Sequence, residues 1–260
     1  MTPTRVLPGI GKAVPPLGLA PNYGLDAAGV REALERLHYV FWTPSPGRMA
    51  RAAAPLREAL KADRERYVIA TGPTVAVTAG NVRRTVERAL EKLDTDYVDL
   101  FQLHWLGVTS AWIDGTLDEM QKLKQEGKVK ALGVSIHDRP RAGRLASDSP
   151  LDMLMIRYNA AHPGAERDIF PHLDRNKRGI VAYTATRWGK LLKRPRGWSG
   201  EVPTAGHCYR FCLADEHVDV CLTGPGNTSE LRENLAALEQ GPLSEDELTW
   251  MRDFGRVVHG

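Results

Sequence analysis

The feature that most constrains this chain is a regular alternation of short apolar segments with longer amphipathic ones. The apolar segments predict strands at residues 39–43, 67–72, 97–105, 129–136, 154–159, 179–185 and 218–224, with a weaker candidate at 15–20. They are rich in β-branched residues and nearly continuous in apolar character. This pattern is typical of strands that are buried on both faces of a parallel sheet.

Between these strands, apolar residues recur with the spacing of one helix face. The pattern predicts helices in the segments 25–37, 80–93, 115–128, 227–241 and 243–258. In the last of them Ser244 is followed three residues later by Glu247, which is a capping-box pattern. We therefore expect a C-terminal helix over about 244–258.

About eight strand–helix alternations fit either a closed eight-stranded barrel or an open doubly wound sheet. An open sheet that binds a dinucleotide would show a G-x-G-x-x-G turn leading into its first helix. The segment "LPGIGKAVPPLGLA" lacks that turn. With no linker, low-complexity tract or fixed-period repeat in the chain, we predict one α/β domain over residues 1–260, a (β/α)8 TIM barrel.

Composition narrows the class of protein further. The net charge is only +3, with basic and acidic residues interleaved, which disfavours nucleic acid as a partner. No apolar run approaches the roughly 20 residues of a membrane span, and the N-terminus lacks the apolar core of a secretory signal. The 3 cysteines have no disulfide-framework spacing. We expect a cytoplasmic protein without a membrane partner, and the sequence leaves its oligomeric state open.

In a (β/α)8 barrel, functional side chains lie at the C-terminal ends of the strands. Polar residues cluster at several of the predicted ends, and buried polar groups need partners. These residues are His104, Ser135, His137, Asn159, His162, Tyr183 and Thr184.

Five segments in order carry a resemblance to a known family. They are "LEKLDTDYVDLFQLHW", "LKQEGKVKALGVS", "YN", "GIVAYT" and "TGPGNTSELRENL". Their order and spacing from about residue 15 to 250 are similar to the aldo-keto reductase superfamily. The resemblance implies a (β/α)8 barrel that binds NADP or NAD without a Rossmann motif and transfers a hydride to or from a carbonyl carbon.

The catalytic set of that family is an aspartate, a tyrosine, a lysine and a histidine. Only the histidine matches here, at His104, while the other three positions hold Trp42, Gly47 and Gly72. General acid catalysis contributes about 100- to 10,000-fold, and neither tryptophan nor glycine can donate the proton. His104 is therefore the remaining catalytic candidate, since an imidazole titrates near neutrality. The alternative is that His104 only packs beneath the barrel mouth.

The cofactor-binding positions of the family are matched better than its catalytic positions. The resemblance implies that Ser135 and Asn159 hold the nicotinamide carboxamide and that Tyr183 stacks on the ring. The pyrophosphate would lie along Thr184 to Gly189, beside a basic cluster that includes Arg194. The adenosine end is implied at Gly224, Asn227, Glu233 and Asn234. Glu230 in that segment would repel a 2′-phosphate, which leaves the choice between NADP and NAD open.

Two charged loops have no counterpart in the resemblance. They contain His137, Arg139, Arg157 and His162, together with Asp138, Glu166 and Asp168. Ion pairs that join the loops would explain these charges, and so would contacts to an acidic small-molecule substrate or to phosphate. Their spacing is not that of metal ligands, so we expect no metal site.

Three functional hypotheses remain. The first is an NAD(P)-dependent oxidoreductase of aldo-keto reductase type with a rearranged active site. The second is a catalytically degenerate barrel, a pseudoenzyme that binds a nucleotide or a partner without turnover. The third is a barrel that performs different chemistry on its charged loops.

Overall fold

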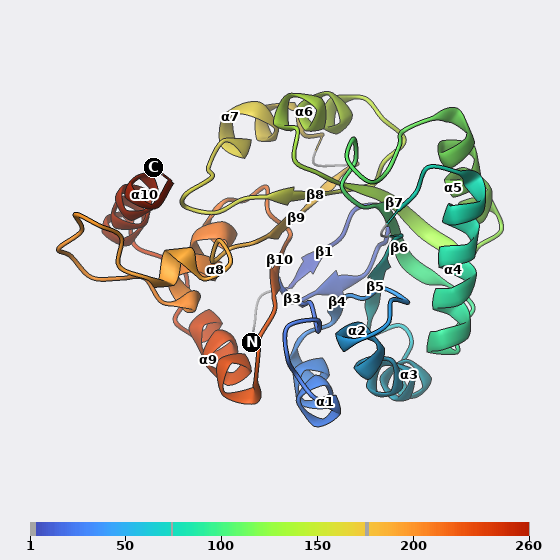
Figure 1. The fold of residues 1–260 in the computed structure, drawn as a ribbon, viewed down its shortest axis with the longest axis horizontal. Helices are drawn as coiled ribbons and strands as arrows, with labels where there is room; N and C mark the ends of the chain where they lie inside the picture. Colours follow the sequence, from blue (N-terminus) through green and yellow to red (C-terminus); the bar gives the residue numbers. More distant parts are fainter. Residues whose placement is uncertain (1–3, 74, 175–176, 260) are drawn as a thin grey trace.

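The computed structural model describes residues 4–73, 75–174 and 177–259. Its centre is a closed barrel of eight parallel strands in the order β10-β3-β4-β5-β6-β7-β8-β9 (Figure 1). The strands are β3 (Leu17–Leu19), β4 (Tyr39–Phe41), β5 (Val68–Thr71), β6 (Val98–Leu103), β7 (Val129–Ile136), β8 (Met153–Arg157), β9 (Gly179–Tyr183) and β10 (Val220–Thr223). The predicted (β/α)8 barrel is confirmed.

Helices surround the barrel on its outer face (Figure 1). They are α1 (Ala27–Arg36), α2 (Arg48–Arg51), α3 (Ala53–Ala62), α4 (Ala79–Leu93), α5 (Asp114–Gln125), α6 (Arg139–Ser147), α7 (Ala165–Asp168), α8 (Ala205–Ala214), α9 (Thr228–Glu239) and α10 (Glu245–His259). Their apolar stripes and the outward side chains of the strands form one large core. The expected C-terminal helix is α10, which packs against α8 and the 3-10 turn Lys190–Leu192.

A second, smaller core fills the inside of the barrel. It is built from alternate residues of the strands, because successive side chains of a strand point to opposite faces. Strand β8 gives Met153 and Met155 to this interior, and Leu154 to the outer core. The short antiparallel hairpin of β1 (Arg5–Val6) and β2 (Ala13–Val14) adds Val14 to the interior core and covers one end of the barrel.

Buried aspartates fix the register where the strands begin. Asp99 accepts the backbone N–H of Ile69 at 2.9 Å, and Asp219 accepts that of Ile180 at 2.7 Å. The Asp99 carboxylate is also paired with Lys12 at 3.0 Å and Arg64 at 2.8 Å. A carboxylate can be buried only when it is paired and hydrogen-bonded in this way. These contacts lie at the end of the barrel opposite the mouth.

Candidate active site at the barrel mouth

The alternation along the strands decides which side chains enter the mouth. Residues that share the inward face with the interior core continue it upward at the C-terminal ends. Those positions are Ala20, Phe41, Gly72, His104, His137, Arg157, Tyr183 and Gly224. The candidate site is therefore set by one ring of residues, each contributed by a different strand or by the loop that follows it.

A cavity of about 550 Å³ opens at this end of the barrel. Three large aromatic side chains on its rim are well exposed: Tyr23 (46%), Trp105 (50%) and Trp188 (60%). The full lining is Ala20, Asn22, Tyr23, Phe41, Trp105, His137, Met155, Tyr183, Thr184, Ala185, Thr186, Trp188, Gly189, Tyr209, Leu222 and Gly224. Exposed aromatic rings around a hollow are suited to contact with a planar or apolar ligand surface.

The loop after β9 adopts an unusual backbone. Thr184, Arg187 and Trp188 have positive φ angles of 57°, 51° and 51°, and Trp105 across the cavity has a φ of 46°. Non-glycine residues rarely occupy this left-handed region, and such residues concentrate at functional sites. The segment predicted to contact pyrophosphate thus has a defined, strained shape and lines the cavity from Thr184 to Gly189.

Trp42 does not enter the cavity. Its side chain is fully buried in the outer core, and its indole N–H donates to the carbonyl oxygen of Met49 at 2.7 Å. The inward neighbour Phe41 lines the cavity instead. Gly47, at the position of the tyrosine, has a φ of +78° and open space around it. No carboxylate or phenol of the family's type is therefore present on this wall.

Gly72, at the position of the lysine, is enclosed. A Cβ atom at this residue would collide with the carbonyl oxygen of Gln102 and would lie 2.8 Å from Nε2 of His104. The backbone of β5 and the imidazole thus occupy the space that any side chain would need. A lysine side chain could not be placed at this position unless the surrounding structure moved.

His104 packs into this closed wall. Its ring lies 5.1 Å from the ring of Phe41, and its Nε2 is buried without a hydrogen-bond partner among the described residues. Burial lowers the pKa of His104 to about 4, against a smaller opposing effect of a hydrogen bond with the Pro73 backbone. The imidazole is therefore neutral near pH 7, and it does not line the mouth cavity.

On the opposite wall, Tyr183 and His137 form a pair. The phenol oxygen of Tyr183 lies 2.8 Å from Nε2 of His137, and both side chains line the cavity. Burial raises the pKa of Tyr183 to about 12, while Arg157 and a hydrogen bond from Ser135 oppose that rise. Burial also lowers the pKa of His137, and Arg157 adds to that effect. The pair is a phenol hydrogen-bonded to an uncharged imidazole.

The predicted carboxamide ligands are placed differently from one another. Ser135 is buried beside Tyr183. Asn159 is fully buried: its amide nitrogen donates to the Thr184 carbonyl oxygen at 2.8 Å, and its amide oxygen accepts from Ala161 and lies 3.1 Å from Nδ1 of His162. Its side chain ties two loops together, and Met155 of the same strand lines the cavity.

The predicted adenosine end is the turn before α9. Asn227 caps this helix by accepting from the backbone N–H of Glu230 at 2.9 Å. The Glu230 carboxylate folds back and accepts from the N–H of Gly226 at 2.7 Å and from the Asn227 amide at 3.0 Å. A negative charge thus already sits at the helix N-terminus, where helix dipole and free N–H groups favour anions.

The other predicted residues of this end lie close by. Gly224 lines the cavity under the ring of Tyr23, and a Cβ there would overlap that ring. Asn234 is buried and donates to Thr223 Oγ1 at 3.0 Å, whereas Glu233 is exposed and lies 3.5 Å from Ser229 Oγ. Gly224 is thus the one of these three that faces the cavity.

Ion pairs account for many charges in the loops after β7 and β8. Asp168 pairs with Arg139 at 3.1 Å and with Arg167 at 2.7 Å. Glu166 pairs with Arg252 at 3.0 Å and accepts from the Tyr158 hydroxyl at 2.7 Å. The predicted phosphate contact Arg194 is exposed and donates to the carbonyl oxygens of its own loop, at Trp198 and Gly200.

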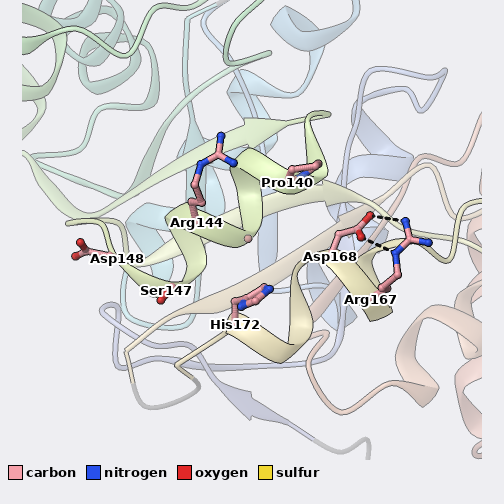
Figure 2. Close-up of a pocket in the computed structure, with 8 residues that line it drawn as sticks. Pro140, Arg144, Ser147, Asp148, Arg167, Asp168 and His172 are labelled. Carbon is pink, nitrogen blue, oxygen red and sulfur yellow. Dashed lines mark hydrogen bonds and ion pairs between the residues drawn. The ribbon is translucent and has the colours of Figure 1, made fainter.

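A separate hollow of about 630 Å³ lies outside the barrel, between α6 and the α7 region (Figure 2). Figure 2 shows Arg167 turned to Asp168 at one end, with Arg144 and His172 on other parts of the lining. None of its lining residues is shared with the mouth cavity. It is open to solvent, and we do not assign it to the active site.

No group of three or more potential metal ligands occurs among the described residues, and Cys208, Cys212 and Cys221 are buried free thiols. A search of the described helices finds none long and apolar enough to cross a membrane. Sequence reasoning missed the cavity aromatics Tyr23, Phe41, Trp105, Trp188 and Tyr209. A strict alternation argument from Tyr39 would have placed Phe41, rather than Trp42, in the mouth.

Comparisons with known proteins identify the family and the fold. The family model "Aldo/keto reductase family" matches residues 48–197. The Arabidopsis thaliana L-galactose dehydrogenase is 27% identical over 93% of this chain and 92% of its own length, and a probable aldo-keto reductase from Glycine max is 33% identical over 68% and 49%.

Solved structures show the same fold. A holo aldo-keto reductase from Bacillus halodurans superposes with a TM-score of 0.81 at 22% identity, covering 98% of this chain and 96% of that one. An aldo/keto reductase from Klebsiella pneumoniae, solved with NADP and acetate, gives a TM-score of 0.75 at 22% identity over 96% and 94%. With the family model matching more than half of the sequence, the chain belongs to the aldo/keto reductase family.

Proposed function

We propose that this protein is an NAD(P)-dependent oxidoreductase that interconverts a carbonyl group and an alcohol with a rearranged active site. The observation that supports this proposal is the open cavity in which the proton-carrying pair Tyr183 and His137 faces the strained loop 184–189. A bound reduced nicotinamide would supply the hydride. The protein would supply the binding surface, the exclusion of water and the proton.

The residues present fit the nicotinamide half of such a cofactor. The cavity is bordered by close backbone at Gly224, where any side chain would overlap Tyr23, and by the loop from Thr184 to Gly189. The adenosine end fits a cofactor without a 2′-phosphate better, because the Glu230 carboxylate already occupies the N–H groups of the turn. We therefore infer a preference for NAD over NADP.

Two groups compete for the role of proton donor. His104 matches the family's histidine, but its Nε2 faces Gly72 and its ring lies behind Phe41. The Tyr183 phenol lines the cavity and lies within hydrogen-bond distance of His137, through which a proton could be restored from solvent. We propose that the Tyr183 hydroxyl protonates the substrate oxygen and that His104 keeps the opposite wall in place.

The closure of the wall around Gly72 bears on the pseudoenzyme alternative. A barrel that had only lost its lysine would retain a gap there, whereas this one has repacked. The repacking fits either relocated chemistry or none. Measurement of turnover therefore has to accompany measurement of binding.

The proposal is tested by titrating the purified protein with NADH and NADPH, following tryptophan fluorescence and heat, and then assaying a panel of small carbonyl compounds. We expect NADH to bind and to be oxidised, and Tyr183→Phe to lower kcat by about 100-fold or more. Binding of neither cofactor at millimolar concentration would refute the proposal. Binding without any turnover supports the pseudoenzyme, and loss of activity only in His104→Ala would return the acid role to His104.

A further inference from the structure

Three adjacent strands place His137, Arg157 and Tyr183 side by side at the top of the barrel. Arg157 is paired in register with Tyr183, and Ser135 is paired with Met155. His137, two residues beyond Ser135, therefore lies level with Arg157. Arg157 belongs to the inward-facing series of Met153 and Met155. The hydrogen bond between Tyr183 and His137 thus joins the two strands on either side of Arg157.

Arg157 is half-buried and has no ion pair or hydrogen bond within the described residues. The acidic residues of the neighbouring loops are already committed, Asp168 to Arg139 and Arg167, and Glu166 to Arg252. A partly buried guanidinium without a counter-charge is costly unless something pairs with it. Because the acidic residues of these loops are already paired, no carboxylate among the described residues remains for Arg157, and its partner would have to be a bound anion.

The charges that act on the aromatic neighbours of Arg157 are those of cations. After burial, Arg157 has the largest effect on the pKa of each of its three ring neighbours, lowering the pKa of His137, His162 and Tyr183. The other charges that act on His162 are those of Arg187, His259 and Arg139, and no carboxylate opposes them. This edge of the mouth therefore has a positive potential that would attract an anion.

We propose that Arg157 is the anchor of an oxyanion subsite in the mouth, which binds the carboxylate of a 2-oxo or 2-hydroxy acid substrate. Arginine binds carboxylates through parallel, charge-assisted hydrogen bonds. With the carboxylate on Arg157, the adjacent carbonyl of the substrate lies next to the neighbouring residue Tyr183. This assignment of substrate class rests on the proposed redox function, although binding of the anion does not require it.

The reaction on such a substrate is balanced. A bound reduced nicotinamide would supply a hydride to the carbonyl carbon, and the Tyr183 hydroxyl would donate its proton to the carbonyl oxygen. The product is the 2-hydroxy acid with its carboxylate still on Arg157. The Tyr183 phenolate would then regain a proton from solvent by way of His137.

The test uses two unreactive probes of equal size, oxalate and oxamide, of which only oxalate is charged. Tryptophan fluorescence reports binding, since Trp105 lies 6.0 Å from His137 and Trp188 lines the cavity. We expect oxalate to bind and oxamide not to bind. Arg157→Met should weaken the binding of oxalate by at least about tenfold, which is the effect of losing a charged hydrogen bond. Arg157→Lys should retain part of the wild-type affinity for oxalate. Arg144→Met, an exposed site on α6, is the control of equal charge.

Several outcomes overturn the proposal: no oxalate binding to the wild-type protein, equal binding of oxamide, or equal weakening by the two methionine variants. The source of the oxyanion is settled by repeating the titration with NADH. Oxalate that binds alongside NADH supports a substrate carboxylate, whereas mutual exclusion assigns the subsite to the cofactor phosphates and overturns the substrate class. Failure of redox turnover with oxalate still binding refutes the proposed function alone.

Discussion

The closed wall at Gly72 makes a strong prediction about stability. In Gly72→Ala, the added methyl group would collide with the Gln102 carbonyl oxygen, which belongs to the backbone of the adjacent strand and cannot rotate away. Overpacking of a core costs about 1–3 kcal/mol, and a backbone obstacle puts this site at the upper end. A loss of about 3 kcal/mol lowers the Tm of a domain of this size by roughly 6–12 °C. Gly72→Lys should be worse and should not restore family chemistry.

The assay is thermal unfolding followed by circular dichroism, with Gly115→Ala as the matched control. Gly115 lies in the first turn of α5 with no atom within 4 Å of the added Cβ, so that variant should be neutral or slightly more stable. The double variant Gly72→Ala/His104→Ala removes the imidazole but leaves the backbone clash, and should recover little. An unchanged Tm in Gly72→Ala, or full recovery in the double variant, would show that this reasoning is wrong.

Three further predictions concern charges. Burial lowers the pKa of His104 from 6.5 to about 4, so the folded chain binds this proton less tightly than the unfolded chain. The free energy of unfolding should therefore fall as the pH is lowered from 6.5 to 4. In His104→Gln, the urea midpoint should depend less on pH over that range. Asp99→Asn should cost about 3–5 kcal/mol in urea unfolding, since the buried carboxylate that pairs with the partly buried cations Lys12 and Arg64 loses its charge. A loss below 1 kcal/mol would contradict this. Glu230→Gln should increase the affinity for NADPH relative to NADH by about fivefold, as measured by calorimetry. The control Glu239→Gln, on the same helix, should leave this ratio unchanged. Equal shifts in both variants would refute a local effect of Glu230.

The fold was predictable because each strand is long or apolar enough to be recognised alone, and even the weak candidate at 15–20 contains β3. The hairpin of β1 and β2 was not, since strands of two residues carry no periodicity. Its place beneath the barrel depends on tertiary packing of Leu7 and Val14 against the interior core. Local propensity contains no information of that kind.

The site was only partly predictable. The resemblance drew attention to Tyr183 and the charged loops to His137, and both side chains line the cavity. The resemblance also implied that Asn159 holds the carboxamide, whereas β8 ends at Arg157 and the Asn159 side chain turns into the loop. Strand alternation, which is sequence information, separates Phe41 from Trp42. The pairing of Arg139 with Asp168 and the isolation of Arg157 could not be read in advance, because they depend on which loop ions meet in space.

The two walls of the mouth differ, and the difference relates the missing family residues on one wall to the proposed proton donor and anion site on the other. On the side of β4 to β6, Phe41, Gly72 and His104 form a packed wall, and burial holds the His104 imidazole neutral. On the side of β7 to β9, the hydrogen-bonded pair Tyr183 and His137 lines an open cavity, and Arg157 lies in the strand between them. A proton donor and an anion site on the second wall would sit beside the nicotinamide region, so carbonyl reduction there would need no residue from the first wall. Substitutions on the two walls should therefore separate: those at Gly72 and His104 should change stability first, and those at Tyr183 and Arg157 should change catalysis and binding with the fold intact.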